Sequence, residues 1–262
     1  MTQPLLVSID KRGVATFTLN RPDVRNAFDE ALIAAICDAF GRYGADDNVR
    51  AIVMTGAGKA FSAGADLNMM RRAAEASTDE NKDDARRLAY MLQAINHCAK
   101  PVVARVNGPA MGGGVGLVAA CDIAVAAEEA FFAFSEVRLG LIPAVISPFV
   151  VQAIRPQEAR RWFLTGERFD AETAKRIGLV HMVSMGAQLD ATVEGVLDNL
   201  LAGGPEAQRE AKALINAVAY RPIDGKTMED TATRIAHVRA SAEGKEGIQS
   251  FLEKRTPGWV KD

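Results

Sequence analysis

The N-terminal part of the chain alternates short apolar runs with stretches of helical spacing. Residues 5–9 and 14–19 are apolar-rich runs separated by turn-forming residues, which predicts two strands. Residues 32–40 instead place apolar side chains at helical spacing, and Asp29 is positioned to cap that helix. Residues 51–54 form an apolar run bounded by glycines, which predicts a buried strand.

The middle of the chain repeats this alternation. Residues 101–106, 123–127 and 130–134 are further short apolar runs that predict strands, and glycines followed by an apolar run at 115–120 predict a helix between the first two. The charged stretch at residues 71–87 is expected to be a solvated loop and helix face.

Beyond about residue 145 the pattern becomes almost entirely helical. One last strand is expected at residues 180–183, and the helical segments are expected at 160–164, 171–177, 189–201 and 211–218. The pattern therefore predicts an α/β body at residues 1–200 and a helical region at 201–262. The sequence Gly203-Gly204-Pro205 marks the boundary between them.

The composition is that of an ordinary globular protein, and it limits the classes of partner and site that we expect. The 262 residues are 48% hydrophobic and carry a net charge of −2, which disfavours nucleic acid and anionic membranes as partners. The three cysteines and three histidines are isolated, without CxxC or HExxH spacing, so neither a metal site nor a disulfide framework is expected. The N-terminus does not read as a signal peptide and no apolar run approaches about 20 residues, so we expect a cytoplasmic protein.

The segment at residues 107–122 carries the strongest chemical signal. Gly112, Gly113 and Gly114 open the predicted helix, where free backbone N–H groups and the helix dipole favour negative charge. Such a corner can bind an anion or stabilise a developing oxyanion. Close helix–strand packing also explains the glycines, and residues 114–119 formally match the G-x-G-x-x-A pattern of dinucleotide-binding proteins.

Two further segments contain candidate chemistry. Residues 56–66 are rich in small residues after a buried strand, so they form either a surface turn or a second set of free amides. Glu136 stands among apolar residues, and burial there would suit it to proton transfer, although a surface ion pair with Arg138 is the simpler alternative. Ser62 lacks the glycine at position 60 that a nucleophile elbow requires, which disfavours a serine hydrolase.

In their order and spacing these segments resemble the crotonase, or enoyl-CoA hydratase/isomerase, family over nearly the whole chain. The resemblance covers an N-terminal CoA-binding turn, two oxyanion segments, an acidic motif, a later signature and a C-terminal helix. These motifs correspond to residues 20–27, 61–67, 100–122, 136–143, 164–180 and 246–254.

The resemblance implies a superhelix of ββα repeats with a helical C-terminal region, assembled as a homotrimer or homohexamer. It implies an acyl-CoA thioester as substrate and no separate cofactor. The backbone amides of Ala65 and Gly113 would hold the thioester oxygen, and Glu136 would act as acid and base. The resemblance also implies CoA-lining residues, with the last two of them contributed by a neighbouring subunit: Arg25, Ala27, Ala63, Asp66, Leu67, Phe251 and Lys254.

One position departs from the family pattern. Typical hydratases of this family have two glutamates beside the water; Glu136 matches the second, but Gly116 stands at the first. Isomerases of the family often keep only the Glu136 equivalent. Residues 135–154 nevertheless resemble a branch that hydrates methylglutaconyl- and isohexenylglutaconyl-type thioesters with a small residue at this position. We therefore expect a 2-enoyl-CoA hydratase, with Δ3,Δ2-enoyl-CoA isomerase or a weakly active acyl-CoA-binding scaffold as alternatives.

Overall fold

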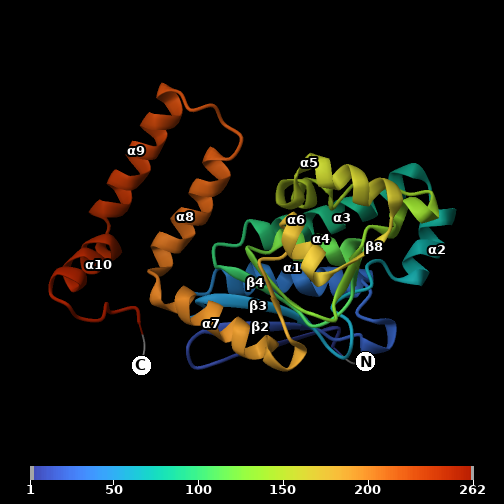
Figure 1. The fold of residues 1–262 in the computed structure, drawn as a ribbon, viewed down its shortest axis with the longest axis horizontal. Coiled ribbons are helices and arrows are strands. Elements are labelled where there is room, and N and C mark those ends of the chain that lie inside the picture. Colours follow the sequence, from blue (N-terminus) through green and yellow to red (C-terminus); the bar gives the residue numbers. More distant parts are fainter. Residues whose placement is uncertain (1–2, 261–262) are drawn as a thin grey trace.

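A mixed six-stranded sheet forms the centre of the molecule (Figure 1). The computed structural model describes residues 3–260. In spatial order the strands are β1 (Leu5–Ile9), β2 (Val14–Leu19), β3 (Ala51–Gly56), β4 (Val102–Val106), β6 (Ile123–Ala127) and β9 (Met182–Ser184). The β1–β2 pair is antiparallel and every other neighbouring pair is parallel.

A three-stranded sheet and the helices complete the fold. The small sheet contains β5 (Ala110–Met111), β7 (Phe131–Ala133) and β8 (Arg168–Asp170). The body helices are α1 (Glu30–Gly44), α2 (Leu67–Glu75), α3 (Thr78–Asn96), α4 (Gly113–Ala120), α5 (Ser147–Thr165), α6 (Ala171–Ile177) and α7 (Leu189–Ala202), with short 3-10 turns η1 (Pro22–Val24), η2 (Ser135–Leu139) and η3 (Gly186–Gln188). The orders β1–β2–α1, β4–β5–α4 and β6–β7–α5 repeat a strand–strand–helix unit.

Both faces of the large sheet are covered, because alternate residues of each strand point to opposite sides. On one face Ile52 and Met54 of β3 belong to the main core, together with the buried side of α1. On the other face Val53 packs in a second cluster with Val193 and Leu197 of α7. The complete burial of β3 follows from this two-sided cover.

Three further helices form a C-terminal arm, defined here as residues 205–252. They are α8 (Pro205–Val218), α9 (Gly225–Ala240) and α10 (Ala242–Leu252), and Figure 1 shows them extending beside the body. The Arg50 guanidinium of the body contacts the chain at both ends of the arm. It donates to the carbonyl of Gly203, just before the arm, at 2.8 Å, and to that of Trp259, in the tail after the arm, at 2.7 Å. Lys212 of α8 adds an ion pair of 2.8 Å with Asp122.

The sequence predicted many element positions and misplaced some. Helix α6 and the first two strands have the predicted bounds, and the Asp29 carboxylate caps α1 by accepting from the Leu32 amide at 2.8 Å. The charged stretch expected to be partly loop is almost entirely helix, because the Ser77–Glu80 capping box restarts the chain as α3 after a short break. The predicted piece at residues 160–164 belongs to the longer α5, and β9 begins two residues late.

None of the helices described within residues 3–260 has the length and apolar character needed to cross a membrane. The three cysteines are free thiols, and burial raises the pKa of Cys98.

Candidate active site

The turn after β2 holds the loop after β3 by backbone hydrogen bonds. The Ala63 amide donates to the Arg25 carbonyl at 2.9 Å, and the Phe28 amide donates to the Gly64 carbonyl at 2.7 Å. Arg25 and its neighbour Asn26 adopt left-handed backbone conformations, with φ of 54° and 56°. The N-terminal turn therefore fixes the course of the small-residue segment that the sequence analysis singled out.

The amide of Ala65 is left free by this arrangement. Phe28 pairs with Ala65 as an isolated parallel bridge, in which the hydrogen bonds use the Gly64 carbonyl and the Asp66 amide. The N–H of Ala65 itself points away from Phe28 and has no acceptor among residues 3–260. The amide of Gly113, the first residue of α4, likewise has no acceptor in the described chain.

The two free amides belong to segments that touch. The Met111 amide donates to the Ser62 carbonyl at 2.9 Å, which joins the loop to the strand before α4. Gly64 has φ of 85°, and a Cβ atom there would lie 3.3 Å from the Gly113 nitrogen and 2.7 Å from the Met111 oxygen. Only glycine allows this approach. The loop that carries the Ala65 amide therefore touches the N-terminus of α4, which is the positive end of the helix dipole, at Gly64.

Glu136 lies next to the same helix start. The Gly112 amide donates to the Ala133 carbonyl at 2.9 Å, which brings η2 against the residues that precede α4. A Cβ atom on Gly112 would lie 3.2 Å from Glu136 Oε1. The structure therefore gathers Ala65, Gly113 and Glu136, which lie far apart in sequence, around one point.

The Glu136 carboxyl group is desolvated and unpaired. Burial raises its pKa above the usual value near 4.5. Its Oε2 atom is buried without a hydrogen-bond partner, and within residues 3–260 no cation forms an ion pair with it. The alternative of a surface pair with Arg138 is therefore wrong. A buried carboxyl group with a raised pKa is a candidate proton carrier.

Asp66 has structural partners that the sequence did not reveal. It is buried, caps α2 by accepting from the Asn68 amide at 2.8 Å, and pairs with Arg21 at 3.1 Å. Arg21 also pairs with Asp29 at 3.0 Å, so this arginine links the N-terminal turn, α1 and α2. Its partner Asp66 is 45 positions away in the chain, a separation that no local pattern signals.

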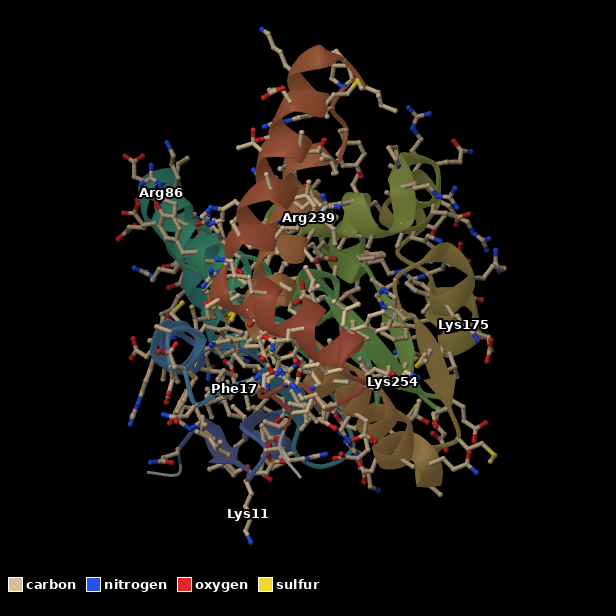
Figure 2. The ribbon with its side chains drawn as sticks, turned by 90° about the vertical axis from the view of Figure 1, so that its left-hand side faces the viewer. Lys11, Phe17, Arg86, Lys175, Arg239 and Lys254 are labelled. Carbon is tan, nitrogen blue, oxygen red and sulfur yellow. The ribbon has the colours of Figure 1, made fainter. Side chains whose placement is uncertain are left out.

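The remaining predicted binding residues divide into two groups. Ala27 is buried in the N-terminal turn, whereas Leu67 is exposed at the start of α2, near the loop that carries Ala65. Phe251 lies in α10 at the end of the arm and Lys254 follows this helix, and Figure 1 shows α10 at the opposite side of the molecule from α2. Figure 2 views the molecule from the arm side, where Lys254 lies. Within one chain, Phe251 and Lys254 therefore do not reach the site formed by Ala65, Gly113 and Glu136.

Ser62 is held by the backbone rather than by a catalytic partner. Its buried hydroxyl donates to the Asn26 carbonyl at 2.9 Å and lies 3.3 Å from the Gly64 amide. No histidine within the described residues hydrogen-bonds to it, which argues against a serine-hydrolase site. Across residues 3–260 there is also no group of three histidine, cysteine or acidic residues arranged to hold a metal ion.

The chain is similar to known proteins over almost its whole length. The family model described as enoyl-CoA hydratase/isomerase matches residues 10–262. An enoyl-CoA hydratase of Alternaria alternata, ACTT6, is 34% identical over 250 residues, which cover 93% of this chain and 80% of that protein.

Solved structures share the whole fold. A crystal structure of an enoyl-CoA hydratase from Shewanella pealeana aligns with a TM-score of 0.94 and 40% identity, covering 98% of this chain and 96% of that one. Pseudomonas aeruginosa AtuE aligns with a TM-score of 0.94 and 36% identity, covering 98% of this chain and 100% of that one. The predicted fold, a superhelix of strand–strand–helix repeats with a helical C-terminal region, is confirmed.

Proposed function

Because the chain belongs to the enoyl-CoA hydratase/isomerase family, we propose that it adds water across the C2=C3 bond of a 2-enoyl-CoA thioester. The observation that carries the proposal is the meeting of two unpaired amides, those of Ala65 and Gly113, with the desolvated carboxyl group of Glu136. These are the groups that an enolate mechanism needs: donors for a developing oxyanion and one proton carrier.

In the proposed reaction the Ala65 and Gly113 amides donate hydrogen bonds to the thioester oxygen. The Glu136 carboxylate accepts a proton from water while the water oxygen bonds to C3. The electron pair of the C2=C3 bond moves toward the thioester, whose oxygen gains negative charge next to the two amides and the α4 dipole. Glu136 then returns its proton to C2, which completes a 3-hydroxyacyl-CoA and restores the carboxylate.

The remaining residues are proposed to bind the CoA part of the substrate. Arg25, Ala27, Ala63, Asp66 and Leu67 belong to the turn and loop whose backbones already interlock beside the amides. Asp66 contributes mainly by holding this turn, because its carboxylate is engaged with Arg21 and the start of α2. Phe251 and Lys254 are proposed to serve a neighbouring subunit of a homotrimer or homohexamer, with residues 201–262 as the association region.

The first test replaces Glu136 with glutamine. Glu136→Gln preserves the shape of the side chain but cannot carry a proton, so kcat for hydration should fall about 10³-fold. Binding of a CoA ester, measured by calorimetry, should remain. The matched control is Glu128→Gln, an exposed glutamate on the turn after β6, which should retain full activity. A Glu136→Gln enzyme with normal kcat would remove the proposed role of Glu136.

A second candidate is Δ3,Δ2-enoyl-CoA isomerisation, favoured by the absence of a side chain at Gly116. In this reaction Glu136 would move a proton between carbons and no water would be consumed. Incubation in heavy-oxygen water distinguishes the two reactions, because only hydration transfers the label to a 3-hydroxyacyl product. If the protein binds CoA esters but converts none in a panel of unsaturated substrates, it is a scaffold rather than an enzyme.

A further inference from the structure

The space next to Gly116 is already filled by another residue. A Cβ atom on Gly116 would lie 2.3 Å from the Cγ2 methyl and 2.9 Å from the Cβ atom of Ile146. Leu92 closes the same space, with its Cδ1 atom 3.7 Å from that position. Ile146 and Leu92 are both buried, so neither can turn away into solvent. Even alanine therefore does not fit at position 116 without displacement of Ile146.

This apolar contact lies one helical turn from Gly112, the residue that the Glu136 carboxylate approaches. The Gly116 amide donates to the Gly112 carbonyl at 3.3 Å, and Gly112 is the residue against which the Glu136 carboxylate lies. One turn of α-helix advances about 5.4 Å. Any side chain carried by residue 116 would therefore begin in the space that Ile146 fills, one turn along α4 from the residue that the Glu136 carboxylate approaches.

Ile146 is itself held firmly. It is the residue before the first turn of α5, and its carbonyl accepts the Val150 amide at 3.1 Å. The next residue, Ser147, ties back to Ala144 through its side chain at 2.7 Å. Ile146 and Gly116 are 30 positions apart in the chain, so no local pattern in the sequence signals their contact.

We propose that Ile146 is a specificity-determining residue that keeps this site to a single carboxylate. Its side chain excludes any side chain at position 116, so Glu136 alone accepts and returns the proton. The inference rests on the proposed function for its chemical consequence, whereas its steric part can be tested without any substrate. The consequence is that water is activated by one carboxylate, and the pair 116/146 sets how the reaction divides between hydration and proton transfer between carbons.

The steric part is tested by thermal unfolding of four proteins. Gly116 lies inside α4, where alanine normally stabilises a helix relative to glycine. Gly116→Ala should instead lower the melting temperature by roughly 5 °C in the wild-type background, because the core is overpacked. Alanine at 146 would not clear the contact, since the Ile146 Cβ atom is itself too close; Ile146→Gly is the required partner.

In the Ile146→Gly background, Gly116→Ala should raise the melting temperature by roughly 2 °C, as ordinary helix propensity predicts. This reversal of sign is the expected signature of a direct contact. A rise in melting temperature for Gly116→Ala in the wild-type background would overturn the proposal, because Ile146 would then not exclude a side chain there.

The chemical part is tested by adding a second carboxylate. The variant Ile146→Gly with Gly116→Glu is compared with Ile146→Gly with Gly116→Gln, which has the same shape but no acid. The glutamate variant should hydrate a 2-enoyl-CoA at least about tenfold faster than the glutamine variant. Its isomerisation rate should not rise, and its pH–rate profile should gain a second ionisation.

Equal hydration rates and identical pH profiles for these two folded variants would overturn the chemical part. Failure of the proposed function looks different: the wild-type protein would then convert no enoyl-CoA, while the reversal of sign in the melting temperatures would still be observed. The two experiments therefore separate the packing role of Ile146 from the reaction assigned to the site.

Discussion

The junction around Glu136 and the C-terminal arm are built in opposite ways. At the junction, buried backbone groups of several segments hydrogen-bond directly to one another, and the contacts leave no space for a Cβ atom on Gly64. In the arm the only buried residue is Ser250 in α10, and large apolar side chains such as Ile223 and Phe251 are exposed. One chain thus fixes the proposed catalytic groups completely but leaves the arm with apolar surface uncovered.

This difference separates the proposed substrate-contacting residues that one chain positions by itself from those that it does not. Ala65, Gly113 and Glu136 depend only on contacts within the body, so their arrangement should survive changes in the arm. Phe251 lies in α10 and Lys254 follows this helix, which Figure 1 shows on the opposite side of the molecule from α2. Changes at the junction should therefore affect turnover, whereas changes that release the arm should first affect stability and assembly.

Among changes to the backbone of the junction, the largest effect on turnover should come from closing the gap at Gly64. Gly64→Ala adds a Cβ atom 2.7 Å from the Met111 oxygen at a φ of 85°, so the loop must move and the Ala65 amide with it. Loss of one oxyanion donor reduces kcat by about 10²–10³-fold. Steady-state kinetics with an enoyl-CoA substrate measures this effect.

Gly178→Ala is the matched control for backbone strain. Gly178 ends α6 with φ of 92°, away from the residues that form the junction. This variant should lose stability but keep the kcat of the folded protein. If both variants lose turnover equally, the effect of Gly64→Ala is general strain rather than displacement of the Ala65 amide.

The next effect should be on stability, through Arg50. This buried side chain donates to the carbonyls of Leu201, Gly203 and Trp259. Arg50→Ala leaves these carbonyls without their charged donor and should cost about 3 kcal/mol of unfolding free energy. Hydrogen exchange should show faster opening of the arm than of the sheet.

The control is Arg86→Gln. Arg86 is an exposed arginine on α3 with one ion pair, so its replacement should cost less than about 1 kcal/mol of unfolding free energy. Equal costs would contradict a special role for Arg50.

A smaller effect is expected from pH. Burial raises the pKa of Glu136, and the proposed hydration begins from its carboxylate form. The value of kcat/KM should therefore fall about tenfold per pH unit once the pH drops below this pKa, which lies above 4.5. A pH–rate profile down to the acid limit of folding measures it. An acid limb at or below pH 4.5 would mean that Glu136 is solvated in the working enzyme.

Local signals in the sequence were sufficient for much of the fold. The β1–β2 hairpin was predicted within its bounds because apolar runs flank a clear turn. Helix α1 was predicted because Asp29 is an N-cap residue that precedes apolar residues at helical spacing. The two-residue strand β5 was missed, since it exists only through pairing with β7, and no run of two residues signals a strand. The helices of the charged stretch were underestimated because exposed helices have a weak apolar pattern.

Candidate site residues could be proposed where one segment carries the chemical signal. The apolar surroundings of Glu136 and the glycines of the α4 corner marked both as candidates, while a surface pair with Arg138 and close packing stayed open as alternatives; their proposed roles came from the family resemblance. Arg21 and Ile146 were not identified as site residues, because each acts on residues distant in sequence: Arg21 on Asp66, and Ile146 on Gly116. Such contacts depend on how the repeats stack, which single-sequence patterns do not encode.

A crystal structure of the wild-type protein with a bound 3-hydroxyacyl-CoA would test whether Ala65, Gly113 and Glu136 act together on the substrate. The thioester oxygen should lie about 2.7–3.1 Å from both the Ala65 and the Gly113 nitrogen, with the Glu136 carboxylate next to the C3 hydroxyl group. A thioester oxygen bound away from either amide, or a Glu136 side chain turned into solvent, would contradict the proposed mechanism.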